Sequence, residues 1–343
     1  MRRRNRESGL TIVELSLTTT ILITLIWLMT TLSMTAVRSE DYAKRISKAT
    51  EACDDILNTM KRSLESSVFI VQLNALGLSY AGLLQNLVTE RIIGVHFPTV
   101  DENGIFEKEA APHTKTGNSL VFAEHYRTDR FTCSSGNTYR IPIYRFQAWY
   151  LVEAKPKSPI KDYGGFNLSM WISEPMADGI RLDKIADPND LLEVVQHLGD
   201  ATPDAEGVTH KPVRLVWKIG GDPAVTGTFR YIDSAVLPCL FDFASVAAIK
   251  INHDPTSSQL DLLNFRGLGI SPNSAPPQAG IAAFSQIDTS GDGFPHGFEI
   301  QITGPASSRE VLLRLSIVDY APGKELLFYR LHVVATTRQG VTS

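Results

Sequence analysis

Proline and charge are both missing from long stretches of the N-terminal region. The first proline is Pro98, so no residue before it interrupts a helix by removing a backbone donor. The 23 residues from Leu15 to Val37 carry no charge, which excludes an ordinary solvated helix, and about 20 such residues are enough to cross a bilayer. Fourteen of the 23 are apolar and nine are Thr or Ser, whose hydroxyls can bond back to helix carbonyls.

The chain also lacks a basic excess and the usual catalytic motifs. It has 33 Lys and Arg against 37 Asp and Glu, for a net charge of −4, whereas broad nucleic-acid binding normally needs a basic face. The eight histidines show no metal-ligand spacing, and no Gly-x-Ser-x-Gly segment occurs. We therefore expect neither a nucleic-acid partner nor enzymatic activity.

What the N-terminus does contain is an ordered set of signals. Four arginines within the first six residues precede Gly9, and Glu14 stands just before the uncharged run. Basic residues before an apolar span keep the N-terminus cytoplasmic. An ordinary secretory signal has an apolar core of about 7–15 residues with the cleavage site after it, whereas here the apolar run is longer and the candidate cut at Gly9 precedes it.

These features resemble the N-terminal segment of type IV pilins and type II secretion pseudopilins. The resemblance implies that a prepilin peptidase cleaves after Gly9 and methylates the new N-terminus at Leu10. It also implies that Glu14, the fifth mature residue, pairs with the Leu10 amine of the next protomer, because a carboxylate at the apolar boundary is costly unless it is paired. The partners implied are the peptidase, the inner membrane and other pilin or pseudopilin subunits.

The expected localisation is a single pass through the bacterial inner membrane, with the head in the periplasm, followed by incorporation into a filament. The expected organisation is a leader over residues 1–9, a long helix over 10–72 with residues 15–37 in the membrane or filament core, and a head over 73–343. The alternative is a plain single-pass anchor or an uncleaved signal, which predicts no cleavage at Gly9.

An apolar stripe predicts that the helix continues beyond the membrane, to about Val71. Its members recur at steps of three or four, which is typical of one face of an amphipathic helix: Ile46, Ala49, Cys53, Ile56, Met60, Leu64, Val68 and Val71. A second, shorter helix is predicted over 73–91, and a third over 189–198 between Pro188 and Gly199. Residues 269–280, with three prolines, are expected to form a long loop.

The rest of the chain reads mainly as strands. Segments rich in β-branched and aromatic residues predict strands over 120–122, 139–144, 145–152, 213–217, 311–318 and 326–335. The predicted fold class is therefore α+β, with one long helix packed on an antiparallel sheet with insertions, as in a pilin-like head. Without residues 1–9 the chain keeps 29 basic and 36 acidic residues, and its large head favours a minor subunit over a major one.

The segment from Asp288 to Glu299 fits a 12-residue calcium loop. A glycine, Gly293, stands at the sixth position, where it permits the sharp turn. The candidate ligands are Asp288, Ser290, Asp292, Phe294 through its carbonyl, and Glu299. The alternative interpretation is a solvated Asp/Gly-rich turn between strands. Ca²⁺ is the only cofactor that the sequence suggests.

Cysteine is scarce, with only Cys53, Cys133 and Cys239 in the chain. Three cysteines allow at most one bridge. Cys133 and Cys239 both belong to the expected periplasmic head, where an oxidised pair can persist, and Cys53 on the apolar stripe reads as a small core residue.

Two further roles stay open at this point. The chain could be a surface adhesin or binding module that uses a pilin stalk for export, with 269–299 as its working surface. It could also be a simple membrane-anchored envelope protein. The sequence does not separate a pilus from a secretion machine.

Overall fold

A computed structural model describes the greater part of the chain. The described residues are 11–87, 92, 94–106, 115–153, 166–200, 212–223, 225, 227, 229, 247–250, 268–271, 297–305, 307–319 and 327–337. The chain divides into two compact units, residues 1–48 and residues 49–343.

One helix, α1 (Ile12–Glu65), runs from the first unit into the second. It confirms the expected long N-terminal helix but ends about six residues earlier than predicted. Residues Ser67–Ile70 form strand β1, which pairs with β3 from Phe122 to Glu124. A short run of apolar and β-branched residues fits both the period of a helix and that of a strand. Here pairing with a neighbouring strand decides in favour of β structure.

The second unit is built on a sheet of 12 strands. Its main path runs in the order β1-β3-β4-β5-β9-β11-β10-β2, with β12 beside β11, β6 beside β4, β7 beside β6 and β8 beside β5. The strands other than β1 are β2 (Val100–Asp101), β3 (Leu120–Thr132), β4 (Thr138–Glu153), β5 (Phe166–Ile172), β6 (Met176–Asp178), β7 (Arg214–Val216), β8 (Ala247–Lys250), β9 (Leu268–Ile270), β10 (Phe298–Thr303), β11 (Arg309–Asp319) and β12 (Leu327–Thr337).

The predicted antiparallel sheet is a mixed one. β2 pairs with β10 and β6 pairs with β7 in parallel, whereas the other pairings are antiparallel. Residues 139–144 and 145–152, predicted as two strands, form one continuous strand of 16 residues, β4. The predicted strands at 120–122, 213–217, 311–318 and 326–335 correspond to β3, β7, β11 and β12.

The second half of α1 buries its stripe against one face of this sheet. Ile56 and Leu64 are fully buried there, beside Phe122 of β3 and Leu313 of β11. The opposite face of β3 and β4 packs on α2 (Ala75–Leu87), which contributes Tyr80 to a second core. Alternation along the strands produces these two faces, since successive side chains point to opposite sides of a sheet.

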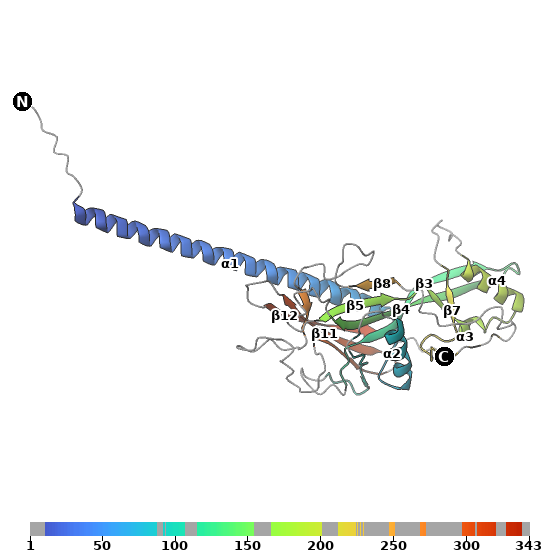
Figure 1. The fold of residues 1–343 in the computed structure, drawn as a ribbon. Helices are drawn as coiled ribbons and strands as arrows, with labels where there is room; N and C mark the ends of the chain where they lie inside the picture. Colours follow the sequence, from blue (N-terminus) through green and yellow to red (C-terminus); the bar gives the residue numbers. More distant parts are fainter. Residues whose placement is uncertain are drawn as a thin grey trace, which may run out of the picture. The chain divides into compact units, whose positions relative to one another are not determined.

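A third, smaller core lies at the end of the sheet away from β11 and β12 (Figure 1). There the β3–β4 hairpin extends past the main sheet and packs with β6, β7, α3 (Gly179–Leu182) and α4 (Pro188–Gly199). The α4 helix confirms the prediction for 189–198, with Asp187 as its N-cap and Pro188 in its first turn. The predicted loop over 269–280 begins within β9, and residues 272–280 lie outside the described part.

Candidate functional site

The first turn of α1 contains a capping box formed by Thr11 and Glu14. The Glu14 carboxylate accepts hydrogen bonds from the Thr11 backbone N–H at 2.9 Å and from its hydroxyl at 3.0 Å. The Glu14 N–H in turn donates to Thr11 Oγ1 at 3.3 Å. Reciprocal bonds of this kind satisfy donors that have no partner within the helix, so these two residues define where α1 begins.

Sequence reasoning predicted a role for Glu14 and missed Thr11. The signal was present, because Thr-x-x-Glu before an apolar run is the pattern of a capping box. Gly9 and Leu10, the predicted cleavage and methylation residues, lie outside the described residues. The structure therefore locates the carboxylate and its partner within this chain but not the predicted cut.

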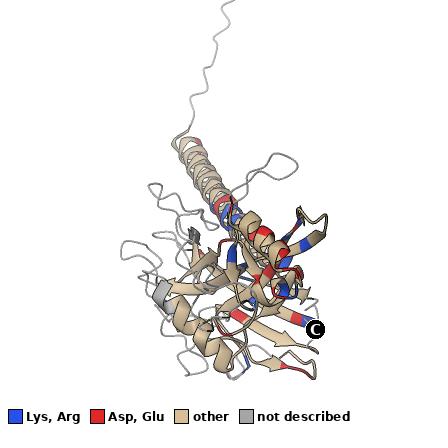
Figure 2. Cartoon of the chain, turned by 90° about the vertical axis from the view of Figure 1, so that its right-hand side faces the viewer, with Lys and Arg blue, Asp and Glu red and all other residues tan. Residues whose placement is uncertain are grey.

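The part of α1 that follows is long and apolar enough to cross a membrane, by length and composition. Its large apolar side chains are exposed, from 48% for Leu28 to 71% for Met29. No charge interrupts α1 between Glu14 and Arg38, and Figure 2 shows this stretch in tan before blue and red positions begin. A surface of this length and composition is suited to an apolar environment.

The threonine hydroxyls in this stretch are satisfied by the helix itself. Each threonine donates to the carbonyl four residues earlier, for example Thr24 to Thr20 at 2.8 Å and Thr31 to Trp27 at 2.7 Å. Because these donors are already bonded, the threonines cost less in an apolar environment than free hydroxyls would. The same bonds are made by Thr18, Thr19, Thr20, Thr30 and Thr35.

The predicted calcium loop falls mostly outside the described residues. Asp288, Ser290, Asp292 and Phe294 all lie there, and only Glu299 is placed. Glu299 lies in β10 and is 2% exposed. It forms an ion pair with Arg314 of β11, in which Arg314 Nη1 lies 3.1 Å from Glu299 Oε2. Within the described segments, no group of three acidic, His or Cys side chains could hold a metal ion, so the calcium site stays a prediction.

Two of the three cysteines are described, and both are free buried thiols. Cys53 is fully buried in the core under α1, where burial, together with the nearby Asp54 charge, raises its pKa to about 12. Cys133 lies at the end of the β3–β4 hairpin, and its Sγ donates to the Asp190 carbonyl at 3.7 Å. Since Cys239 is outside the described residues, the Cys133–Cys239 bridge also stays a prediction.

Asp190 of α4 fixes the end of the hairpin to the third core. It is 1% exposed, and its Oδ2 accepts from Asn137 Nδ2 at 2.9 Å and from the Tyr139 hydroxyl at 2.8 Å. These hydrogen bonds, led by that from Asn137, lower the pKa of Asp190, and the bond to Asp190 raises the pKa of Tyr139 to about 12. These hydrogen bonds join α4 to the β3–β4 hairpin, so we assign the cluster a structural role.

Comparison with protein-family models, with curated proteins and with solved structures gives no match to this chain.

Proposed function

We propose that this chain is a prepilin-like minor subunit of a type IV pilus or a type II secretion pseudopilus. The observation that carries the proposal is the order of signals at the N-terminus: a basic leader, Gly9, Glu14 five residues into the mature chain, and an uncharged helix long enough to cross a bilayer. Each signal is common by itself, whereas their coincidence in order and spacing is specific.

In this proposal the apolar part of α1 first anchors the chain in the inner membrane and later packs with other subunits. Apolar helices without charged faces associate by van der Waals packing and interhelical hydrogen bonds. The Glu14 carboxylate then sets the axial position, because it must find a positive partner in an apolar surrounding. The α-amino group of a neighbouring processed subunit supplies that charge and competes with Thr11 for the carboxylate.

The proposed place of the subunit is a low-copy position, such as the filament tip. The second compact unit extends over 295 residues, 49–343, and a head of that size would pack poorly if repeated along a filament. At the tip a large head is free to prime assembly or to contact a substrate.

The first experiment measures the intact mass and the N-terminal sequence of the protein after expression with and without a prepilin peptidase. We expect a chain starting at N-methylated Leu10 only when the peptidase is present. An unchanged Met1 start in both samples would remove the basis for filament assembly. That result would leave a membrane-anchored envelope protein as the better account.

An adhesin carried on a pilin stalk is the second candidate, with 269–299 as its working surface. Deleting the head discriminates the two roles. Loss of filaments on deletion supports the assembly role, whereas intact filaments that have lost adhesion support the binding role.

We also propose calcium binding by residues 288–299, which is a claim independent of assembly. The Asp292→Ala variant removes one candidate ligand oxygen and leaves the Glu299–Arg314 pair intact. We expect calcium, but not magnesium, to raise the melting temperature of the wild-type head and not that of the variant. Equal melting temperatures of the wild type with and without calcium would count against the site.

A further inference from the structure

A small hollow lies beside the edge of β4 at the end of the sheet that carries the third core. Its volume is about 140 Å³. It is lined on one side by β4 and on the other by the segment that includes α3, through residues that include Arg140, Ile141, Pro142, Asp178, Arg181 and Leu182.

The hollow exists because Pro142 ends the pairing of β4 with β6. β6 pairs with β4 at Tyr144 and Ile143 and leaves it at the next residue. Proline has no N–H to donate to a ladder and is therefore found at strand edges. Pro142 lies opposite Thr128 of β3. Because proline cannot donate a backbone hydrogen bond to β3, this pair must be of the non-hydrogen-bonded type, in which the backbone groups of Pro142 point away from β3.

The same alternation sends the backbone N–H and C=O of Arg140 away from β3 and toward the hollow. Arg140 is two residues from Pro142 on the same strand, so it too occupies a non-hydrogen-bonded position, opposite Arg130. Among the described residues, no hydrogen bond is made to these backbone groups of Arg140. The edge of β4 thus offers a donor and an acceptor to a further strand.

Positive charge is concentrated at this edge. Arg130 and Arg140 face each other directly across the two strands, in the type of pair where side chains approach most closely, and like charges so placed are destabilising. Both side chains are exposed. Neither has an ion-pair partner in the described part of the chain.

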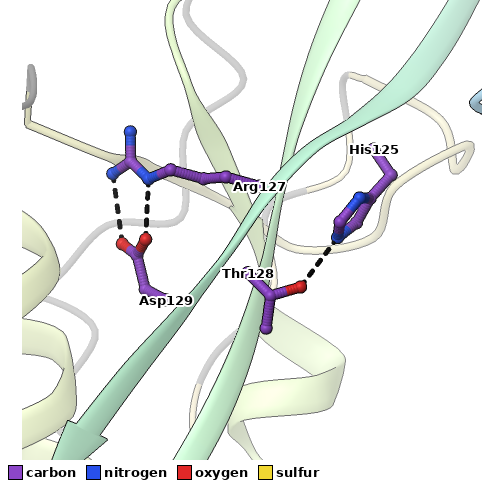
Figure 3. Close-up of polar contacts among 4 residues, drawn as sticks. All are labelled: His125, Arg127, Thr128 and Asp129. Carbon is purple, nitrogen blue, oxygen red and sulfur yellow. Dashed lines mark hydrogen bonds and ion pairs between the residues drawn. The ribbon is translucent and has the colours of Figure 1, made fainter.

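A neighbouring arginine on the other face of β3 shows the contrast. Arg127 is held by Asp129, with Nε 2.6 Å from Oδ1 and Nη2 3.1 Å from Oδ2 (Figure 3). That charge is therefore neutralised within the strand. Within the described ranges, no carboxylate forms such a pair with Arg130 or Arg140.

The second wall of the hollow adds Arg181 and one carboxylate, Asp178. The carboxylate is already engaged, because Oδ1 accepts from the Arg181 backbone N–H and Oδ2 accepts from the Ile219 N–H, both at 3.2 Å. The Arg181 side chain is exposed and lines the hollow together with Arg140. Two arginines therefore line a hollow in which Asp178 is the only carboxylate among the described residues, and that carboxylate is bound to backbone donors.

We propose that this hollow docks an extended peptide segment that carries a carboxylate side chain, from a partner protein. The segment adds to the edge of β4 through Arg140, and its carboxylate is bound by Arg140 and Arg181. Strand addition supplies affinity through backbone hydrogen bonds, and a pocket for one side chain supplies specificity. Arginine is suited to this role because its planar fork matches a carboxylate.

The dimensions and the charge of the chain favour this occupant over others. Ligand pockets for small molecules usually measure about 300–1,000 Å³, so a hollow of about 140 Å³ suits a single side chain. Nucleic acid is disfavoured because the chain is acidic overall, with a net charge of −4. This inference depends on the head alone and does not require the proposed assembly role.

The test measures binding of a capped pentapeptide, Thr-Val-Glu-Val-Thr, to the full chain in detergent micelles at low ionic strength. A twin peptide with Gln in place of Glu is the matched control. We expect the Gln peptide to bind about tenfold more weakly, and R140Q and R181Q each to weaken the Glu peptide by about tenfold, because charge-assisted bonds are lost. The R62Q variant, which removes an exposed charge on α1, should change binding by less than about twofold.

Methylation of single backbone nitrogens then tests strand addition. Alternate amides of an added strand point toward the edge of β4. The peptides N-methylated at position 2 and at position 3 should therefore differ by about tenfold in binding affinity. Several results would overturn the proposal: no binding of the Glu peptide, equal loss in R62Q and R140Q, equal effects of the two methylated peptides, or competition by inorganic phosphate or glutarate as strong as by the peptide itself.

Discussion

The two halves of α1 share one backbone geometry and place their apolar side chains in opposite surroundings. In the first half Ile26 is 57% exposed, whereas Ile56 in the second half is fully buried. The first half carries no charge on any side from Leu15 to Val37, whereas the second half has charged residues and buries its apolar residues along one stripe. The sheet supplies the apolar contact for the second half, whereas the first half is long and apolar enough to cross a membrane, by length and composition.

Helix propensity alone does not distinguish an exposed apolar helix from one that packs in a core. Both halves are continuous α-helix. What differs is the distribution of polar side chains around the axis, which decides whether one face or the whole circumference must leave water.

The largest effect is expected from truncating matched isoleucines in the two halves. Ile56→Ala should lower the free energy of unfolding of the head by about 2–5 kcal/mol, because it leaves a cavity in a close-packed core. Ile26→Ala should change it by less than about 0.5 kcal/mol. Denaturant unfolding of both variants measures the two changes in unfolding free energy. A similar loss of unfolding free energy in the two variants would show that Ile26 and Ile56 are equally buried in the protein.

A charge placed in each half tests the membrane assignment. Leu25→Arg should raise the cost of membrane insertion by about 2.5–3.5 kcal/mol, because the guanidinium enters the apolar span. Asp55→Arg, on the exposed side of the second half, is the control and should leave insertion unchanged. The fraction that resists alkaline carbonate extraction is the readout, and full resistance of Leu25→Arg would argue against a membrane-spanning first half.

Removing the capping box should have a smaller effect, confined to the first turn. Thr11→Ala removes the hydroxyl contacts to Glu14 and should cost about 0.5–2 kcal/mol of helix stability at that end. Thr11→Ser keeps the hydroxyl and should retain protection. Amide hydrogen exchange of the first turn is the measurement, and equal exchange in the two variants would show that Thr11 does not define the start of α1.

The smallest effects are expected from matched threonines that bond back to the helix. Thr24 donates to Thr20 at 2.8 Å and Thr59 donates to Asp55 at 2.7 Å. Changing either residue to Val should alter the unfolding free energy of the head by less than about 0.5 kcal/mol, because the bonds are local and surface-exposed. A loss above about 1 kcal/mol for Thr24→Val alone would mean that the first half contributes to the stability of the head.

Much of the helical structure could be predicted from sequence periodicity, and the errors have physical causes. The stripe correctly indicated a buried face from Ala49 to Leu64, but its apparent continuation to Val71 was wrong because β1 pairs with β3 there. β4 was split in two at Arg145, since no local signal shows that both segments pair with the same neighbour, β3.

The candidate sites divide in the same way. Glu14 and its partner Thr11 are three residues apart, so a local motif identifies them. The hollow combines Arg140 with Asp178 and Arg181, about 40 residues further along the chain, and no local pattern could have placed them together. Glu299 was predicted from a local motif as a metal ligand, and only the register of β10 with β11 reveals that it faces Arg314.

The sequence by itself determined the N-terminal half of α1, including where it begins, how long it remains uncharged and which hydroxyls can bond back to it, because these features depend on neighbours within one or two turns. The tertiary structure alone decided which strands adjoin, that the sheet is mixed, that Arg130 lies opposite Arg140 and that Arg140 and Arg181 line one hollow. Those features depend on strand register and on chain crossings between residues far apart in sequence, where pairing free energy outweighs local preference.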